Sequence, residues 1–210
     1  MNVKVKICGL TRPTDALAAL EAGADYLGFI LYERSPRHIA PEQLRELIVQ
    51  LPQHAVKVGV FVNADFDFIV RTVDACRLDV VQLHGDEDAM FAGRLRDYGL
   101  RIWKALHLTQ PEQFSGMEDF PAEALVIDSS TPQARGGTGL CCDWQLAAAA
   151  AKRWRVMLAG GINPGNAVTA AVQVQPYGLD VASGVESAPG IKDHQRIRQL
   201  MHNLQQAKMR

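Results

Sequence analysis

The sequence lacks several features that would place it in a special class of protein. It has no excess of charge, because 22 Lys and Arg residues stand against 23 Asp and Glu residues, which gives a net charge of −1. Without an overall positive field to attract polyanions, we expect no nucleic acid partner. Its apolar runs are far shorter than the roughly 18 to 20 residues that a membrane-spanning helix needs, so we expect no membrane partner.

Cysteine is also scarce. The chain has four cysteines, with neither CxxC pairs nor the spacing of a disulfide framework, so we expect free thiols: Cys8, Cys76, Cys141 and Cys142. His84 ends an apolar run, but no second run ends in His, so no metal site is predicted. Residues 1–8 alternate apolar and basic residues as a strand does, which predicts no secretion signal and a cytoplasmic location.

What the sequence does contain is a repeated alternation of strand and helix patterns. Segments with helix-start signals separate the apolar runs, and these signals include Thr11-Arg12-Pro13, Pro41-Glu42, Ala64-Asp65, Asp86-Glu87, Asp143-Trp144, Asn163-Pro164 and Lys192-Asp193. Division of the length by eight gives roughly 26 residues per unit, which predicts a single-domain (β/α)8 TIM barrel over residues 1–210. The eight apolar runs rich in Val, Ile and Leu are residues 3–8, 26–31, 56–62, 80–84, 101–106, 124–128, 156–160 and 178–183.

The positions of the glycines favour a barrel over an open doubly wound sheet. An open sheet carries a GxGxxG fingerprint after its first strand, whereas here Cys8-Gly9-Leu10-Thr11 follows the first run. Glycine turns follow the seventh and eighth runs instead, as Gly160-Gly161 and Ser183-Gly184. Barrels commonly bind phosphate at these two turns, so the sequence predicts a phosphorylated small-molecule substrate.

Residues at the carboxyl ends of barrel strands face the active site, which selects the candidates for chemistry. Cys8 could act as a thiolate base, or it could be a small buried hydrophobic residue. Asp128 could donate a proton, or it could cap the turn that follows it. These alternatives are open on the residues alone.

Two basic residues and one histidine complete the candidates. Arg37 follows the second run and suits a substrate carboxylate, although a solvated surface arginine would look the same. His84 could bind substrate or could be an ordinary histidine at the rim. Lys104 could form a Schiff base, but a barrel-interior lysine paired with a carboxylate is the preferred interpretation.

Several motifs together resemble one enzyme family over nearly the full length of the chain. The family is phosphoribosylanthranilate isomerase of tryptophan biosynthesis, an isomerase with a (β/α)8 barrel. The motifs, in chain order, are Lys6-Ile7-Cys8-Gly9-Leu10-Thr11, Ser35-Pro36-Arg37, Val60-Phe61-Val62-Asn63, Gln82-Leu83-His84-Gly85-Asp86-Glu87, Gly136-Gly137-Thr138-Gly139 and Asp180 to Glu186.

The resemblance implies an activity and roles for the candidate residues. The reaction is the Amadori rearrangement of N-(5-phosphoribosyl)anthranilate to its carboxyphenylamino-deoxyribulose phosphate isomer, without a cofactor. Asp128 would be the general acid that opens the sugar ring, and Cys8 the general base that removes the C2′ proton. Arg37 would hold the anthranilate carboxylate, and His84 would be a further substrate-binding residue. The phosphate would lie on Gly160, Gly161, Ser183 and Gly184.

The chain departs from the family pattern at two places. Ala182 stands where a serine is expected, and Leu140-Cys141-Cys142 stands where a basic and an aromatic residue are expected. The alternatives are a pentose-phosphate epimerase, an indole-glycerol-phosphate synthase and a catalytically silent barrel that binds a sugar phosphate. The first two would need metal ligands or a set of catalytic lysine and glutamates that we do not find, and a silent barrel has no need of both Cys8 and Asp128. The sequence does not decide between a monomer and a homodimer.

Overall fold

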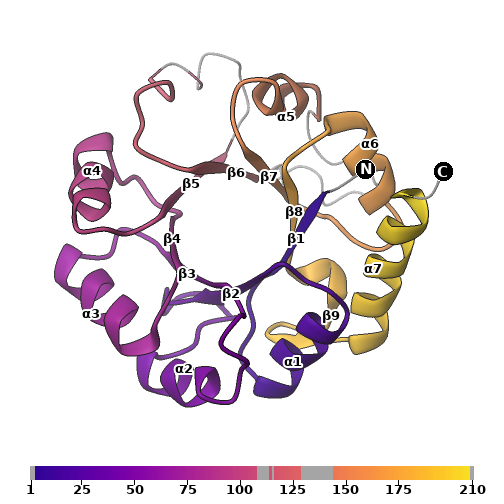
Figure 1. Ribbon diagram of the computed structural model, residues 1–210, viewed down its shortest axis with the longest axis horizontal. Helices are drawn as coiled ribbons and strands as arrows, with labels where there is room; N and C mark the ends of the chain where they lie inside the picture. The colour runs from indigo at the N-terminus through magenta and orange to yellow at the C-terminus, as the bar shows by residue number, and fades with distance from the viewer. Residues whose placement is uncertain (1–2, 108–113, 115, 129–143, 209–210) are drawn as a thin grey trace.

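Eight parallel strands form a closed ring in the computed structural model, which describes residues 3–107, 114, 116–128 and 144–208. Each strand pairs with its neighbours in chain order, and β8 returns to pair with β1, with Lys6 beside Asp180 (Figure 1). The predicted (β/α)8 barrel is therefore confirmed. The strands are β1 (Lys4–Ile7), β2 (Tyr26–Ile30), β3 (Lys57–Phe61), β4 (Val80–Leu83), β5 (Ile102–His107), β6 (Ala124–Asp128), β7 (Val156–Ala159) and β8 (Gly178–Val181).

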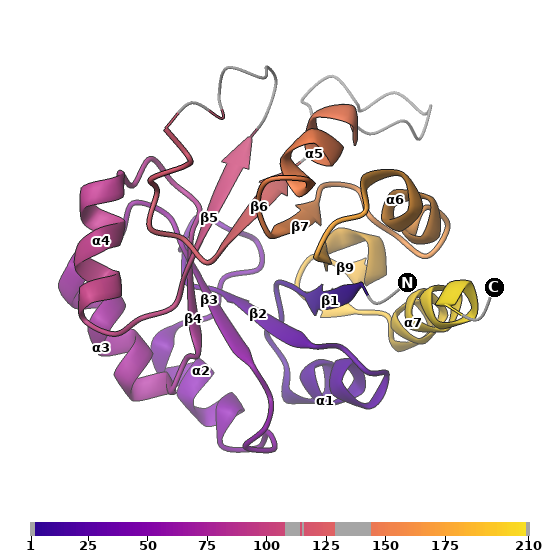
Figure 2. The same cartoon turned by 45° about the horizontal axis from the view of Figure 1, so that its top comes forward.

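The helices surround this ring and follow the strands along the chain, as Figure 2 shows from a tilted view. After β8 the chain makes the short 3-10 helix η2 (Ser183–Val185) and a small hairpin of β9 (Glu186–Ala188) and β10 (Ile191–Lys192). The α-helices are α1 (Pro13–Glu21), α2 (Pro41–Ile48), α3 (Phe66–Cys76), α4 (Ala89–Asp97), α5 (Trp144–Ala151), α6 (Ala167–Val174) and α7 (His194–Lys208).

The eight predicted strands all occur, and their ends differ from the predicted ends by at most two residues. Helix starts were predicted less well, because two signals mark turns instead. The Asp86-Glu87 signal is wrong: Asp88 caps α4 by accepting the N–H of Phe91 at 2.7 Å, while Glu87 accepts the backbone N–H of Asn63 at 2.8 Å. A carboxylate engaged with another loop cannot also cap a helix.

The second displaced start belongs to α6. Asn163 accepts the N–H of Gly165 at 2.8 Å through its side chain, which closes a turn before the helix begins at Ala167. Asn and Asp side chains commonly make such turns with a backbone N–H two residues on. The Asn163-Pro164 signal thus marks the turn, and the helix begins later than predicted.

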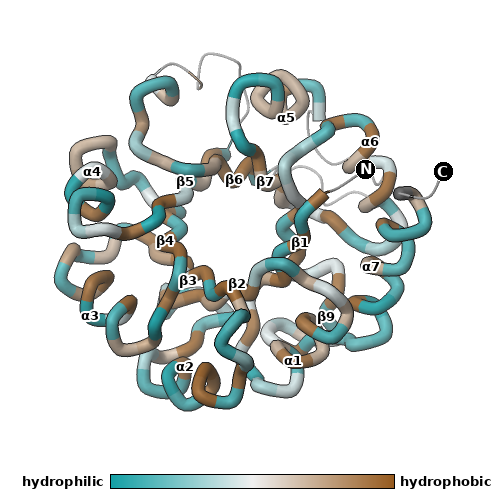
Figure 3. The backbone as a smooth tube through the Cα atoms, in the orientation of Figure 1, coloured by the Kyte–Doolittle hydropathy of each residue, from teal (hydrophilic) through white to brown (hydrophobic). Residues whose placement is uncertain are grey.

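Two apolar cores stabilise the barrel. One fills the space between the strands and the helices, and Figure 3 shows its hydrophobic residues along the strands and on parts of the helices. The other lies inside the ring, where the Trp103 side chain is fully buried and meets the Tyr26 ring edge-on at a centroid distance of 5.0 Å. Because side chains alternate along a strand, each of the strands β2 to β7 contributes to both cores, whereas β1 and β8 contribute apolar residues to the outer core alone.

Some sequence predictions concern residues outside the described part of the chain. These are the glycine-rich segment Gly136 to Gly139 and the adjacent pair Cys141-Cys142. Cys8 and Cys76 are described, and both are free thiols as predicted. Across the described segments, no helix has both the length and the apolar character needed to cross a membrane.

Candidate functional site

A cavity of about 330 Å³ lies at the carboxyl ends of the strands and brings together most of the predicted site residues. Cys8 follows β1, His84 follows β4 and Asp128 ends β6, so these three side chains reach the cavity from different parts of the ring. The other predicted residues in its wall are Arg37, Gly160, Gly161 and Ser183. Gly184 is not among the lining residues.

Strand alternation explains why these residues meet and which residues lie beneath them. Residues two apart on a strand point to the same face, so Lys6 lies below Cys8, and Gln82 lies below His84. Lys6 and Gln82 are buried inside the ring, and Asp180 of β8 joins them there. A layer of polar side chains therefore lies between the apolar interior core and the cavity.

Cys8 is buried against β2, at a place where the residue of β2 must be glycine. A Cβ atom on Gly28 would lie 2.8 Å from the Cys8 sulfur and 2.8 Å from the Lys6 Cε atom, so Gly28 makes room for both side chains. Burial raises the pKa of the Cys8 thiol, and the Lys6 ammonium opposes that rise most strongly. The cation beside it makes the thiolate more accessible than burial alone would allow.

Lys6 connects Cys8's side of the ring to β4. Its ammonium donates to Asp180 Oδ2 at 2.8 Å and to Gln82 Oε1 at 2.6 Å. Gln82 Nε2 in turn lies 3.0 Å from His84 Nδ1. Burial lowers the pKa of His84, and the nearby Lys6 lowers it further, so the imidazole is neutral at pH 7.

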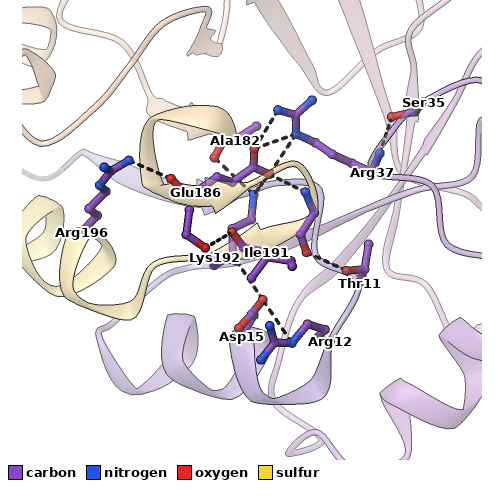
Figure 4. Close-up of polar contacts among 12 residues, drawn as sticks. Thr11, Arg12, Asp15, Ser35, Arg37, Ala182, Glu186, Ile191, Lys192 and Arg196 are labelled. Atoms are coloured by element: carbon purple, nitrogen blue, oxygen red, sulfur yellow. Dashed lines mark hydrogen bonds and ion pairs between the residues drawn. The ribbon is translucent and has the colours of Figure 1, made fainter.

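Arg37 lies at the rim and is held by a carboxylate that the sequence did not assign to the site. Its Nε atom donates to both oxygens of Glu186 at 2.9 and 3.0 Å, and its Nη2 atom donates to Oε2 at 2.7 Å (Figure 4). Lys192 donates to the other side of Glu186, at 2.7 Å from Oε1. The fork of the guanidinium is therefore fixed before any ligand arrives.

The two glycine turns have specific backbone reasons for glycine. Gly160 and Gly161 have φ angles of 88° and 65°, in the left-handed region that other residues rarely adopt. Gly184 has a different reason, because a Cβ there would overlap the carbonyl oxygen of Ile162. Gly184 thus lets the loop after β8 pack directly on the loop after β7.

Lys104 is paired with a carboxylate, as we preferred, but it does not point into the ring as expected, because its strand neighbours Trp103 and Ala105 do. Its ammonium donates to Glu87 Oε2 at 2.9 Å and to the Gly85 carbonyl at 2.6 Å, and both ionic side chains are buried. A second cavity of about 830 Å³ lies on this side, and its wall shares His84 and Asp128 with the first. A charge-paired lysine is a poor Schiff-base nucleophile, since that chemistry needs a neutral amine.

Sequence reasoning missed five polar residues in or beneath the site: Lys6, Gln82, Asp180, Glu186 and Lys192. The first three carried a usable signal, because each is a polar residue two positions before a strand-end position in one of the apolar runs. Glu186 and Lys192 carried none, because they lie in β9 and β10, and the path of this hairpin is not evident from the sequence. In the residues that the structure describes, no three His, Cys, Asp or Glu side chains are grouped to hold a metal ion.

Comparison with known proteins gives a consistent result. Residues 5–203 match the family model described as N-(5'phosphoribosyl)anthranilate (PRA) isomerase. A relative from Geobacter sp. (strain M21), named N-(5'-phosphoribosyl)anthranilate isomerase, is 46% identical over 198 residues, which cover 94% of this chain and 96% of the relative. A relative of the same name from Geobacter sulfurreducens is 44% identical over 199 residues, covering 95% and 97%.

Solved structures agree with these matches. The crystal structure of phosphoribosyl anthranilate isomerase from Thermotoga maritima has a TM-score of 0.89 and 35% identity, covering 98% of this chain and 100% of that one. A second structure of such an isomerase, in complex with reduced 1-(o-carboxyphenylamino)-1-deoxyribulose 5-phosphate, has a TM-score of 0.86 and 34% identity, with the same coverage.

Proposed function

The chain belongs to the N-(5'-phosphoribosyl)anthranilate isomerase family, and from this premise we propose that it isomerises phosphoribosylanthranilate with Asp128 as general acid and Cys8 as general base. The product is 1-(2-carboxyphenylamino)-1-deoxyribulose 5-phosphate, an intermediate of tryptophan biosynthesis. The observation that carries the proposal is that Cys8 and Asp128, from β1 and β6, line the same cavity. An acid and a base on separate walls can act on separate atoms of one substrate.

The first step uses Asp128. Its carboxylic acid donates a proton to the ring oxygen of the sugar while the bond between that oxygen and C1′ breaks. The lone pair of the anthranilate nitrogen forms the new C=N bond, which gives an open-chain protonated Schiff base and the Asp128 carboxylate. The half-buried position of Asp128 at the end of β6 supports this role, because the side chain reaches the cavity and the strand fixes its backbone.

The second step uses Cys8. Its thiolate takes the C2′ proton, the electron pair of the C–H bond forms a C1′=C2′ double bond, and the C=N electrons return to nitrogen. The resulting enolamine tautomerises to the ketone product. Lys6 favours the thiolate that this step requires, and the positive charge of the Schiff base makes the C2′ proton more acidic.

Substrate binding would use the rim of the cavity. Glu186 occupies Nε and Nη2 of Arg37, which leaves Nη1 without a partner in the described part of the chain and available to the anthranilate carboxylate. The backbone N–H groups at the start of η2, together with the Gly160-Gly161 turn, would bind the phosphate, since the first N–H groups of a helix have no acceptor inside it. His84 would contact the sugar, which would lie between Arg37 and the phosphate site. The cytoplasmic location stays a prediction.

The test is an activity assay on the purified protein. We expect the anthranilate-type fluorescence of phosphoribosylanthranilate to decrease without added metal or cofactor. Cys8→Ser and Asp128→Asn each remove a proton-transfer group, a contribution of typically 10²- to 10⁴-fold, so kcat should fall by about that factor.

Two matched variants control for nonspecific effects. Cys76→Ser changes a buried thiol on α3, and Asp97→Asn changes an exposed carboxylate at the end of α4; neither lines the cavity, and both should keep near wild-type kcat. The proposal would be wrong if the wild-type protein were inactive, or if Cys8→Ser and Asp128→Asn both retained nearly full activity.

A further inference from the structure

A continuous chain of buried polar side chains crosses the interior of the ring directly beneath the cavity. It runs from Asp180 on β8 through Lys6 on β1 to Gln82 on β4, and it ends at His84 in the cavity wall. We propose that Gln82 is a positioning residue that holds His84 as a neutral imidazole with its proton on Nε2, so that His84 presents a fixed N–H donor to the substrate. The use of that donor rests on the proposed function, whereas the tautomer does not.

The direction of each hydrogen bond in the chain follows from Lys6. An ammonium has three donors and no acceptor, so the atom of Gln82 that faces it at 2.6 Å must be the amide oxygen. The amide nitrogen then faces His84 Nδ1 at 3.0 Å and donates to it. Lys6 and Gln82 are 0% and 1% exposed, so water cannot substitute for either partner and the amide cannot turn over without leaving buried groups unpaired.

The tautomer of His84 follows from the same logic. A ring nitrogen that accepts a hydrogen bond carries no proton, so the proton of the neutral ring must be on Nε2. A doubly protonated ring would place the Nδ1–H of His84 against the N–H of Gln82, and two donors repel each other. Gln82 therefore excludes both the imidazolium and the other neutral tautomer.

The charges that face His84 act in both directions, and burial is the largest cause of its lowered pKa. Lys6 from β1 and Lys104 from β5 disfavour the imidazolium, whereas Asp128 from β6 and Asp180 from β8 favour it. Each lysine is paired with a carboxylate, Lys6 with Asp180 and Lys104 with Glu87. Together with burial, this arrangement keeps the pKa of His84 below its ordinary value.

A donor of fixed direction has a specific use at this place. His84 and Asp128 line the same wall, where the acid must deliver a proton to one oxygen of the sugar. A neutral Nε2–H can hold a neighbouring sugar oxygen without itself giving up a proton, so His84 does not compete with Asp128 as the proton donor. An imidazolium would compete for that role.

The first test measures the tautomer in the substrate-free wild-type protein. The two ring nitrogens of ¹⁵N-labelled histidine have distinct chemical shifts when protonated and unprotonated, and the His84 signals are identified by their loss in His84→Asn. We expect an unprotonated Nδ1 and a protonated Nε2 throughout pH 7 to 8. A protonated Nδ1 in this range would overturn the proposal.

The second test uses a nearly isosteric substitution to reverse the direction of the hydrogen bond between residue 82 and His84. In Gln82→Glu the new carboxylate accepts from Lys6 and also accepts from His84 Nδ1, so the proton moves to Nδ1 and the pKa of His84 rises. Loss of one well-placed donor should lower kcat/KM by about 10- to 100-fold. Gln173→Glu makes the same chemical change on an exposed face of α6 and should alter neither the tautomer nor kcat/KM.

The outcomes separate the two proposals. A Gln82→Glu protein that retains the Nε2–H tautomer, or full kcat/KM, would contradict the positioning role. Because the wild-type tautomer is measured without substrate, an Nε2–H tautomer in a protein without isomerase activity would support positioning by Gln82 while refuting the proposed function. The wild-type measurement also stands if Gln82→Glu fails to fold.

Discussion

Ion pairs occur at both ends of the barrel with similar distances but very different burial. At the amino ends of the strands, the Lys4–Asp25 pair is 2.7 Å long and its side chains are 38% and 28% exposed. At the carboxyl ends, the Lys6–Asp180 pair is 2.8 Å long and its side chains are 0% and 7% exposed. The two lysines are two residues apart on the same strand. Because the two pairs have similar N–O distances but different burial, the distance alone says little about what each pair contributes to stability.

The pairs at the amino end connect neighbouring units in a regular way. Asp25 precedes β2 and accepts from Lys4 and from the backbone N–H of Val5 on β1. Asp79 precedes β4 and makes the equivalent contacts with the side chain and backbone of Lys57 on β3. These pairs are local and partly solvated, and such pairs contribute about 0 to 1 kcal/mol each to stability.

The pairs at the carboxyl end join distant parts of the chain and lie next to the reacting groups. Lys6 and Asp180 come from the first and last strands, and Arg37 and Glu186 from the loops after the second and eighth. Loss of one member of the Lys6–Asp180 pair leaves a buried charge without that partner, which costs about 3 to 5 kcal/mol. The same residue types thus link neighbouring strands at one end of the barrel and organise the candidate site at the other.

Substitution of the two lysines on β1 should give the largest difference in the free energy of unfolding between the two ends of the barrel. Lys6→Met leaves the Asp180 carboxylate without a partner for Oδ2, and its Oδ1 already has none among the described residues. We expect the free energy of unfolding in urea to fall by about 3 to 5 kcal/mol. Lys4→Met is the matched control and should lower it by less than about 1 kcal/mol. Equal losses in the two variants would show that burial does not separate the two ends.

Glu186→Gln should have an intermediate effect on the free energy of unfolding, and this effect should depend on pH. Burial alone would raise the pKa of Glu186, but hydrogen bonds from Arg37 and Lys192 outweigh it and hold the pKa below the ordinary 4.5. A carboxylate with a lowered folded-state pKa stabilises the protein above pH 4.5, and this contribution is lost as the pH falls further. Urea denaturation should therefore show a deficit of about 1 to 3 kcal/mol for Glu186→Gln at pH 7.

The deficit of Glu186→Gln should shrink as the pH is lowered below 4.5, because the wild-type carboxylate then becomes protonated. Glu123→Gln is the control at the amino end: a hydrogen bond from Arg101 lowers the pKa of Glu123 as well, but this side chain is 32% exposed. We expect a change of less than about 1 kcal/mol there. A deficit for Glu186→Gln that does not vary with pH would contradict this assignment of its role.

The smallest effect is expected for Arg101→Gln. Arg101 donates to both oxygens of Glu123 at 2.8 and 2.9 Å, yet its side chain is 47% exposed. The expected loss in the free energy of unfolding is about 0.2 to 1 kcal/mol at low salt, and it should diminish at 1 M salt, where the Debye length is about 3 Å. A large loss that salt does not reduce would mean that pairs at this end also behave as buried pairs.

The sequence by itself determined the strands and most helix starts of this protein. The runs of Val, Ile and Leu predicted all eight strands, and local signals such as Pro13, Pro41 and Asp65 marked helix starts, because capping and backbone restriction act within a few residues. Strand ends in a parallel barrel converge at one face, so the order of the strands was enough to place Cys8, Asp128 and His84 together.

Only the tertiary structure decided how these residues are supported. Alternation along a strand places Lys6 and Gln82 inside the ring, but it does not say that they touch, since 76 residues separate them. That contact requires the ring to close with a particular register, as does the pairing of Lys6 with Asp180, 174 residues away. Short-range preferences thus determined the elements and the faces of their side chains, whereas closure of the barrel selected the partners of Cys8, His84 and Arg37.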